Sequence, residues 1–269
     1  MFLAAAFYWA FAYDDAYAFW VIPPVIALAS LYVLEPQLNW WIWKRYPPDL
    51  KPGFRQLLEQ HSGYYQRLDD GAKREFRRRV FLFTQGSDFM PQAFEEVPED
   101  IKVMIAVGAV QLTLGREDFL FPKFETIIVY PHPFPSPQYP EHWHGSELYE
   151  PDGALLFSAE HLTRAFIQER LYLNLALYEY ARAFRLVYAY PPPPDAAVYP
   201  WEALERASGF SQEAVSRWIG LDEIDAFGVA AALFFSMPDA FARELPEAYA
   251  AFRAYFGQDP QQPPRSLSA

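Results

Sequence analysis

Cysteine is absent from this sequence of 269 residues. Its absence excludes disulfide bonds, zinc sites built from thiolates and cysteine nucleophiles, and it leaves the redox compartment undetermined. Histidine is scarce, so few imidazole groups are candidates for binding a metal or for acid–base chemistry. The five that exist are His61, His132, His142, His144 and His161.

Positive charge is also in short supply. The 22 lysines and arginines are outnumbered by 34 aspartates and glutamates, which gives a formal net charge of -12. Because surfaces that bind nucleic acids are basic, this balance predicts no nucleic acid partner. Hydrophobic residues make up 52% of the chain, enough for a sizeable core in one large domain or two small ones.

The longest stretch without charge lies near the N-terminus. Residues 1–34 are apolar apart from two aspartates, and residues 16–34 contain no charged side chain. About 19 residues of helix suffice to cross the hydrocarbon core of a bilayer. Tryptophans mixed with a lysine and an arginine follow, in the pattern of an interfacial belt with a positive flank. We therefore expect a hydrophobic N-terminal membrane segment over residues 1–46, inserted through residues 16–34.

The acidic residues before this segment and the basic residues after it predict a membrane-anchored protein whose main domain is cytoplasmic. Three other interpretations stay open. Residues 27–29, Ala-Leu-Ala, are similar to a signal-peptide cleavage site. Pro23 and Pro24 could bend a re-entrant or interfacial hairpin. The segment could also be a helix buried in the core of a cytoplasmic protein.

The pattern after this segment predicts one mostly helical α+β domain over residues 47–257. Residues 101–114 are almost wholly apolar and too short to span a membrane, so we expect a buried helix. Residues 126–130 and 154–158 are rich in β-branched or large apolar side chains and predict two short strands. Residues 258–269 are rich in Gln, Pro and Ser, which predicts a disordered tail.

A long helical pattern covers residues 160–189, and the pentapeptide Tyr-Glu-Tyr-Ala-Arg lies at its centre. In the zinc-peptidase motif His-Glu-x-x-His, two histidines on one helix face bind zinc and the glutamate between them is the general base. Here Glu179 keeps the base position, whereas Tyr178 and Arg182 stand at the two ligand positions. A phenol that loses its proton at about pH 10 is a poor ligand, and a guanidinium has no acceptor to offer.

The segment 131–146 offers a second set of candidate residues. It is rich in proline and contains His132 as well as a His-x-His pair formed by His142 and His144. We interpret it as a candidate binding loop. The alternative is an active metal-dependent hydrolase with relocated ligands, in which the paired histidines act with Glu179 or Asp225.

Several blocks taken together resemble the Mlc titration factor A family of zinc peptidases. Each block is short, but their order and spacing are similar to those of that family over about residues 54–260. The blocks are residues 114–115 and 124–134, 153–158, 174–184, 225–241 and 245–260.

This resemblance implies a zincin-like core with a small sheet of short strands, and it implies a zinc ion as cofactor. It also implies that Asp225 stands where the family has its third ligand, a glutamate. Because both histidine positions are replaced, we expect the site to hold no metal and the chain to have no cofactor, with zinc as the alternative. Without zinc-bound water, Glu179 has no nucleophile to deprotonate.

The arginine at the second ligand position suggests what takes the place of zinc. We expect Arg182 to act as a built-in cation held by Asp225 and Glu179 through charge-assisted hydrogen bonds. If Arg182 lay beyond salt-bridge reach of Asp225, the idea would fail. The simpler interpretation is a surface pair between residues three apart on one helix.

The predicted function is that of a catalytically inactive homologue of a zinc peptidase. It would bind a peptide or protein partner in a regulatory role at the membrane, with residues 154–158 as the edge strand of the groove. The family's known binding of a transcriptional repressor, which the resemblance brings with it, is consistent with regulation. A further interpretation is a structural protein in which the former active site is only part of the hydrophobic core.

Overall fold

The computed structural model describes residues 22–188 and 190–262, and the chain divides into two compact units, Met1–Pro47 and Pro48–Ala269. The first unit contains helix α2 (Ile22–Arg45), in which no residue is buried. Two prolines occupy its first turn, where the missing backbone N–H costs no helical hydrogen bond.

The prediction of a membrane span is not upheld. In the part of the chain that the structure describes, no helix has the length and apolar character needed to cross a bilayer. Helix α2 has 24 residues, but Glu35, Lys44 and Arg45 make its second half too polar. The predicted span of residues 16–34 lies partly outside the described residues. The localisation expected from it, a membrane anchor with a cytoplasmic main domain, is therefore corrected.

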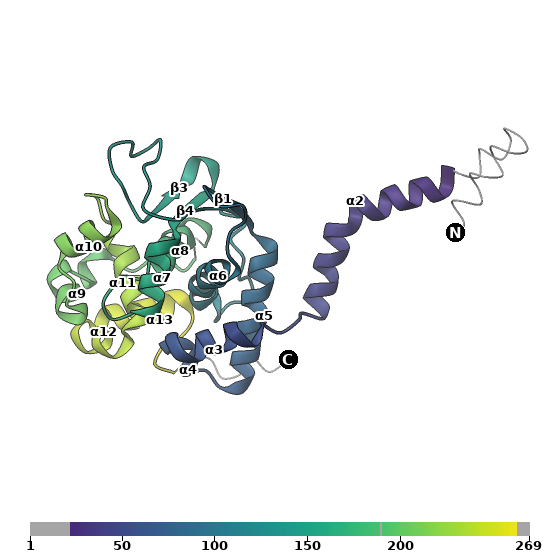
Figure 1. The fold of residues 1–269 in the computed structure, drawn as a ribbon. Helices are drawn as coiled ribbons and strands as arrows, with labels where there is room; N and C mark the ends of the chain where they lie inside the picture. Colours follow the sequence, from purple (N-terminus) through teal and green to yellow (C-terminus); the bar gives the residue numbers. More distant parts are fainter. Residues whose placement is uncertain (1–21, 189, 263–269) are drawn as a thin grey trace, which may run out of the picture. The chain divides into compact units, whose positions relative to one another are not determined.

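The second unit is mostly helical and contains a small sheet (Figure 1). Its elements are α3 (Pro52–His61), α4 (Gly63–Gln66), α5 (Asp70–Gly86), β1 (Asp88–Pro91), α6 (Glu99–Thr113), β2 (Thr126–Tyr130), β3 (Ser146–Tyr149), β4 (Ala154–Ser158), α7 (Ala159–Ile167), α8 (Leu175–Val187), α9 (Trp201–Ser208), α10 (Gln212–Ile219), α11 (Ala226–Ser236), α12 (Pro238–Glu244) and α13 (Pro246–Phe256). The predicted α+β class is confirmed for this unit.

The four strands follow the order β1-β2-β4-β3. Strands β1, β2 and β4 are parallel, and β3 runs antiparallel to β4 with Ser146 opposite Phe157. Strand β4 is therefore an interior strand, and the expectation that residues 154–158 form the edge of a groove is wrong. The sequence gives little sign of β3, because it is a four-residue strand that follows an irregular proline-rich loop.

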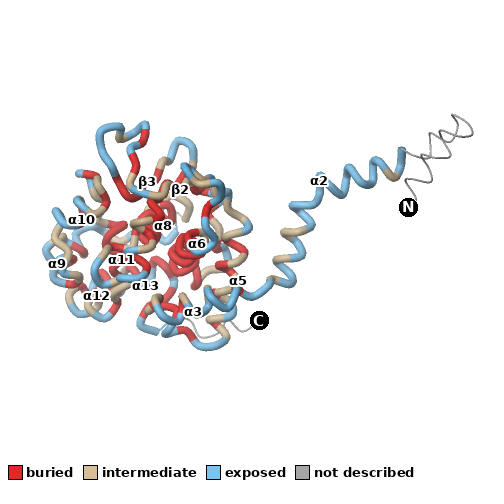
Figure 2. The backbone as a smooth tube through the Cα atoms, viewed as in Figure 1, coloured by how far each residue is buried: buried red, intermediate tan, exposed pale blue. Residues whose placement is uncertain are grey.

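The two faces of the sheet pack against different material. One face meets the main core, in which α6 and α8 are almost entirely buried (Figure 2). Their close approach requires Gly108 on α6, since a Cβ there would lie 2.7 Å from the Cβ of Ala176. The other face carries a small cluster formed by Phe134, Ala154 and Leu156, with partly buried aromatic and aliphatic neighbours. The loop between β2 and β3 thus contributes Phe134 to the face opposite the helices.

Two predicted segments have other bounds in the structure. The helical pattern over residues 160–189 is two helices, α7 and α8, because Asn174 caps the start of α8 by accepting a hydrogen bond from the N–H of Leu177 at 3.1 Å. The predicted tail begins too early, since Gln258 is buried and its amide donates to the carbonyl oxygens of Gln111 and Leu112. Residues 263–269 lie outside the described residues.

Candidate functional site

Three elements bring four predicted site residues together with Ser146. Strand β3 supplies Ser146, helix α8 supplies Tyr178, Glu179 and Arg182, and Asp225 precedes helix α11. We call these five residues the inner site. Helices α8 and α11 approach closely here, because a Cβ on Gly228 would lie 2.8 Å from the ring of Tyr178.

Glu179 is fully buried at the centre of the inner site. The hydroxyl of Ser146 donates a hydrogen bond of 2.8 Å to its Oε1, and Arg182 donates one of 2.6 Å to its Oε2. Burial raises the pKa of the Glu179 carboxyl, while the nearby Arg182 and the Ser146 hydroxyl oppose that rise. Both carboxylate oxygens are therefore engaged by the protein itself.

Arg182 bridges the two acidic residues of the inner site. Its Nη1 pairs with Glu179, and its Nε lies 3.7 Å from Oδ2 of Asp225. The guanidinium carbon lies 5.4 Å from the ring centroid of Tyr178. Burial opposes the charge of Arg182, but Glu179, Tyr178 and Asp225 raise its pKa, so the group stays protonated. Asp225 is within salt-bridge reach, so the geometry passes the test set by the sequence.

Asp225 has two further tasks. Its Oδ1 caps α11 by accepting from the backbone N–H groups of Phe227 and Gly228, at 2.9 and 3.3 Å. Its Oδ2 accepts a hydrogen bond from Arg185, which lies one turn beyond Arg182. The backbone N–H of Asp225 donates to the hydroxyl of Tyr178 at 3.1 Å. The Tyr178 hydroxyl thus accepts from the backbone of Asp225.

The inner site is closed on the side of the sheet. Ser146 is fully buried, and Glu147 and Leu148 on the same edge strand are 3% and 9% exposed. The C-terminal end of α10 covers the start of this strand, since the N–H of Gly145 donates to the carbonyl oxygen of Ile219 at 2.7 Å. An extended peptide has no open edge at β3 on which to add a strand.

A zinc ion does not fit the inner site as it is built. A catalytic zinc needs three protein ligands with lone pairs and one open position. Here Arg182 places N–H donors on Glu179 and Asp225, and Tyr178 holds its proton because burial raises the pKa of the phenol. Among the described residues, no group of three or more histidine, cysteine, aspartate or glutamate side chains is arranged to hold a metal ion.

The histidines of the candidate binding loop lie in different surroundings. His132 is largely exposed and pairs with Glu160 at 2.9 Å. His144 is fully buried and lies 3.0 Å from Glu147, whereas the neighbouring His142 is exposed. The relocated metal site predicted as an alternative is therefore not found in the described part of the chain, because His144 faces a carboxylate on β3 and His142 faces outward.

Three residues of this region were missed at the level of sequence. Ser146 and Glu147 belong to a strand too short to show a clear period, and Arg185 looked like an ordinary charge near the end of α8. A helical spacing of three between Arg182 and Arg185 was the available signal for a second arginine on Asp225.

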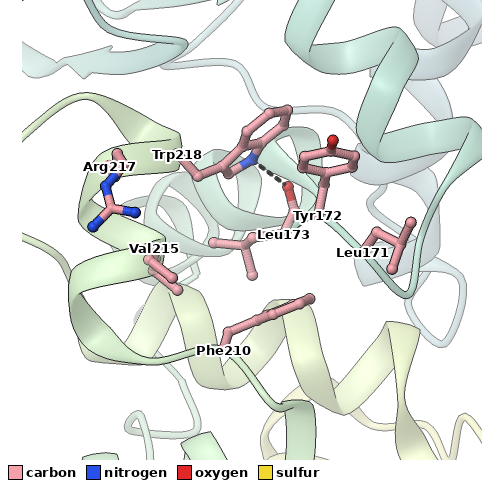
Figure 3. A pocket seen from close by; sticks show the side chains of 8 residues that line it. Leu171, Tyr172, Leu173, Phe210, Val215, Arg217 and Trp218 are labelled. Atoms are coloured by element: carbon pink, nitrogen blue, oxygen red, sulfur yellow. Dashed lines mark hydrogen bonds between the residues drawn. The ribbon is translucent and has the colours of Figure 1, made fainter.

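A cavity of about 280 Å³ lies apart from the inner site, between the loop before α8 and helix α10 (Figure 3). Trp218 lines one side of it and donates from Nε1 to the carbonyl oxygen of Leu173 at 3.0 Å. The ring of Tyr172 contacts Trp218 in a tilted arrangement with centroids 4.3 Å apart, and Leu171 is 67% exposed beside them. The lining is mainly apolar and includes Leu171, Tyr172, Leu173, Phe210, Val215 and Trp218.

The fold and the arrangement of α8 against the sheet define an α+β unit in which α8 carries the buried Glu179. The family model of the glucose-regulated metallopeptidase M90 matches residues 38–182, a little more than half of the chain, and the chain belongs to this family. The resemblance to the Mlc titration factor A family is thereby confirmed. No curated protein matches the chain.

Membership corrects one prediction. The expectation that the chain has no cofactor is contradicted, because the family is one of metallopeptidases. The side chains of Tyr178 and Arg182 determine the chemistry of one site only. Helix α8 up to Arg182 lies within the matched residues, whereas Asp225 lies beyond them.

Proposed function

We propose that this chain is a catalytically inactive member of the metallopeptidase family, which acts by binding a peptide or protein partner in a regulatory role. In this proposal, Tyr178 and Arg182 stand at the positions of the two zinc-binding histidines and Glu179 at that of the general base. Asp225 stands at the position of the third ligand.

The ion pairs of Arg182 carry this proposal. A guanidinium within 2.6 Å of Glu179 and 3.7 Å of Asp225 supplies the positive charge that two clustered carboxylates otherwise need from a metal. Arg185 adds a second positive charge on Asp225, so two acids meet two bases. A buried carboxylate without such a partner would cost several kcal/mol or take up a proton. Arginine suits this place because its charge does not depend on pH in the range where proteins are stable.

The partner would bind away from the inner site. The edge of β3 is buried, so we do not place a peptide there. The apolar cavity of Figure 3 is the site that we favour, with an apolar side chain of the partner inserted against Trp218 and Tyr172. Aromatic walls of this kind provide large contact areas and are typical of the centres of interfaces.

The inactive site is tested by restoring the family's ligands. We expect Tyr178→His/Arg182→His to gain one zinc ion per chain relative to the parent, measured by elemental analysis after dialysis against zinc-containing buffer. Tyr172→His/Arg164→His is the control, since it adds two histidines elsewhere. A parent protein that cleaves casein, with Glu179→Gln abolishing the cleavage, would overturn the proposal.

The binding role is tested by filling the cavity. Peptides selected from a random display library against the parent should lose at least tenfold in affinity for Ala214→Trp, because Ala214 is exposed and lines the cavity. Ala250→Trp, an exposed alanine on α13, is the matched control and should bind as the parent does. Selected peptides that bind all three proteins equally would argue against this site.

A further inference from the structure

The imidazole of His144 lies between two hydrogen-bond acceptors. Its Nδ1 is 2.9 Å from the carbonyl oxygen of His142, and its Nε2 is 3.0 Å from Oε2 of Glu147. A carbonyl oxygen can only accept, so Nδ1 carries a proton. A neutral imidazole has a single N–H, so its Nε2 would then point a lone pair at the carboxylate. The contact with Glu147 therefore requires one more proton, held by either partner.

We call His144 and Glu147 the latch pair. Both side chains are buried, so water screens their electrostatic interaction only weakly. His144 is fully buried and Glu147 is 3% exposed. Glu147 neighbours Ser146 on β3 and, because side chains alternate along a strand, points to the sheet face opposite Glu179. Among the described residues, Glu147 forms no ion pair with lysine or arginine, and His144 is its one basic partner.

The other side chains that the structure describes around the latch pair carry no positive charge that could replace the extra proton. The rings of Phe134 and Tyr139 flank the imidazole of His144, at centroid distances of 4.5 and 5.6 Å. Tyr130 on β2 is the other titratable neighbour, and burial together with the carboxylate of Glu147 raises the pKa of its phenol. Tyr130 therefore stays neutral, and the charge balance of this face depends on the proton of the latch pair.

The latch pair holds the loop of residues 131–145, here named the lid loop. Phe134 and His144 exchange two backbone hydrogen bonds of 3.1 Å across this loop. Phe134 stacks on Tyr130 with centroids 4.1 Å apart and covers Ala154 and Leu156 on the outer face of the sheet. The hydrogen bond between His144 and Glu147 joins the end of the lid loop to β3, the strand beside β4 in the sheet that the loop covers.

We propose that the lid loop is a pH-sensitive cover over the outer face of the sheet, closed while the latch pair holds its extra proton and opened when that proton is lost. Loss of the proton leaves a buried carboxylate facing a lone pair, and opening lets water reach both groups. Opening would uncover the apolar side chains of Phe134, Ala154 and Leu156. The inference does not depend on whether the inner site is catalytic.

Hydrogen exchange at the amides of Phe134 and His144 tests the cover. Protection factors, corrected for intrinsic exchange, are measured from about pH 5.5 to about pH 8.5, a range centred near the ordinary pKa of histidine. In the parent, protection of both amides should fall with rising pH by up to tenfold per unit. In Glu147→Gln, the new amide can donate to a neutral imidazole, so protection should persist without this pH dependence.

A control and a second measurement keep the inference falsifiable. His132→Gln removes the other His–Glu pair of the lid loop, in which His132 is exposed, and should leave the pH dependence of the parent unchanged. If Glu147→Gln fails to fold, the ring nitrogens of His144 in the parent decide by NMR. A neutral imidazole beside an ionised Glu147, or protection in the parent that does not vary with pH, would overturn the proposal.

Discussion

Two buried glutamates lie on either side of strand β3, and they are neutralised in different ways. Glu179 on the helical side meets Arg182, whose charge is fixed, whereas Glu147 on the outer side meets His144, whose charge can be lost. Both carboxylates are almost inaccessible to water. The difference separates a permanent structural ion pair on helix α8 from one between the loop and strand β3 that responds to protons.

The largest expected effect is the removal of the fixed cation. Arg182→Ala leaves Glu179 buried without its ion-pair partner, so we expect a loss of about 3–5 kcal/mol in the free energy of unfolding, measured by urea titration. Arg217→Ala is the control, because its pair with Glu213 is exposed and should cost less than about 1 kcal/mol.

The same variant has a predictable response to pH. Burial already raises the pKa of Glu179, and loss of Arg182 removes the main opposing influence. A glutamate with a raised pKa binds more protons folded than unfolded, so its contribution is fully present at low pH and lost as pH rises. Arg182→Ala should therefore cost less at pH 5 than at pH 8. An equal loss at both values would contradict the assignment.

A third glutamate sharpens the comparison, because it has neither a close arginine nor a histidine. Burial raises the pKa of Glu169 to about 7, while the backbone N–H of Gly63 and the more distant Arg67 and Arg170 oppose the rise. Its stabilising contribution is present below its unfolded pKa and is lost as pH rises through about 7.

Glu169→Gln removes this titration and should stabilise the protein at pH 8 by about 1–3 kcal/mol, with little gain at pH 4.5. Thermal unfolding of the parent and the variant across this range gives the comparison directly. Glu59→Gln, at an exposed position on α3, provides the baseline. A gain at pH 4.5 as large as that at pH 8 would point to a cause other than ionisation.

A packing change should affect the helical side alone. Gly228→Ala adds a Cβ 2.8 Å from the ring of Tyr178, which forces α8 and α11 apart at a cost of about 1–3 kcal/mol. The NMR signals of Tyr178 and Arg182 should shift, whereas those of His144 should not. Shifts of equal size at His144 would mean that the two sides of β3 are mechanically coupled.

The smallest expected effect concerns the start of the helix that carries Glu179. Asn174→Ala removes the side-chain cap on the N–H of Leu177 and should cost about 1 kcal/mol. Asn174→Asp keeps an acceptor and should recover most of that loss, as judged by thermal unfolding. A full loss in Asn174→Asp would show that the cap is not what the residue provides.

The sequence predicted those features that depend on local pattern. The apolar run of α6 and strands β2 and β4 were found because spacing and composition report them. Residues 178, 179 and 182 came from comparison with a zinc-peptidase motif, and residue 225 came from the family resemblance. Features that depend on tertiary pairing escaped. Strand β3 has only four residues, and its position at the sheet edge follows from pairing with β4. The hydrogen bond from Ser146 to Glu179 depends on that position.

The N-terminal segment was misjudged for a related reason. Composition over residues 16–34 suggested a span, but helix α2 extends into charged residues and does not have the apolar character for one, as far as the structure describes it. The histidine pair was misjudged because two residues apart in sequence, His142 and His144, take opposite environments when the loop between them is not a strand. Composition alone does not show where a helix ends or which way the side chains of a loop face.

The central claim is that Arg182 is present to neutralise Glu179, and a double-mutant cycle measures this directly. The free energy of unfolding is determined for the parent, Arg182→Ala, Glu179→Gln and the double variant by urea titration at pH 7. The account predicts that Glu179→Gln restores at least about 2 kcal/mol of the stability lost in Arg182→Ala, because a neutral amide no longer needs the cation. Losses that simply add in the double variant would contradict it.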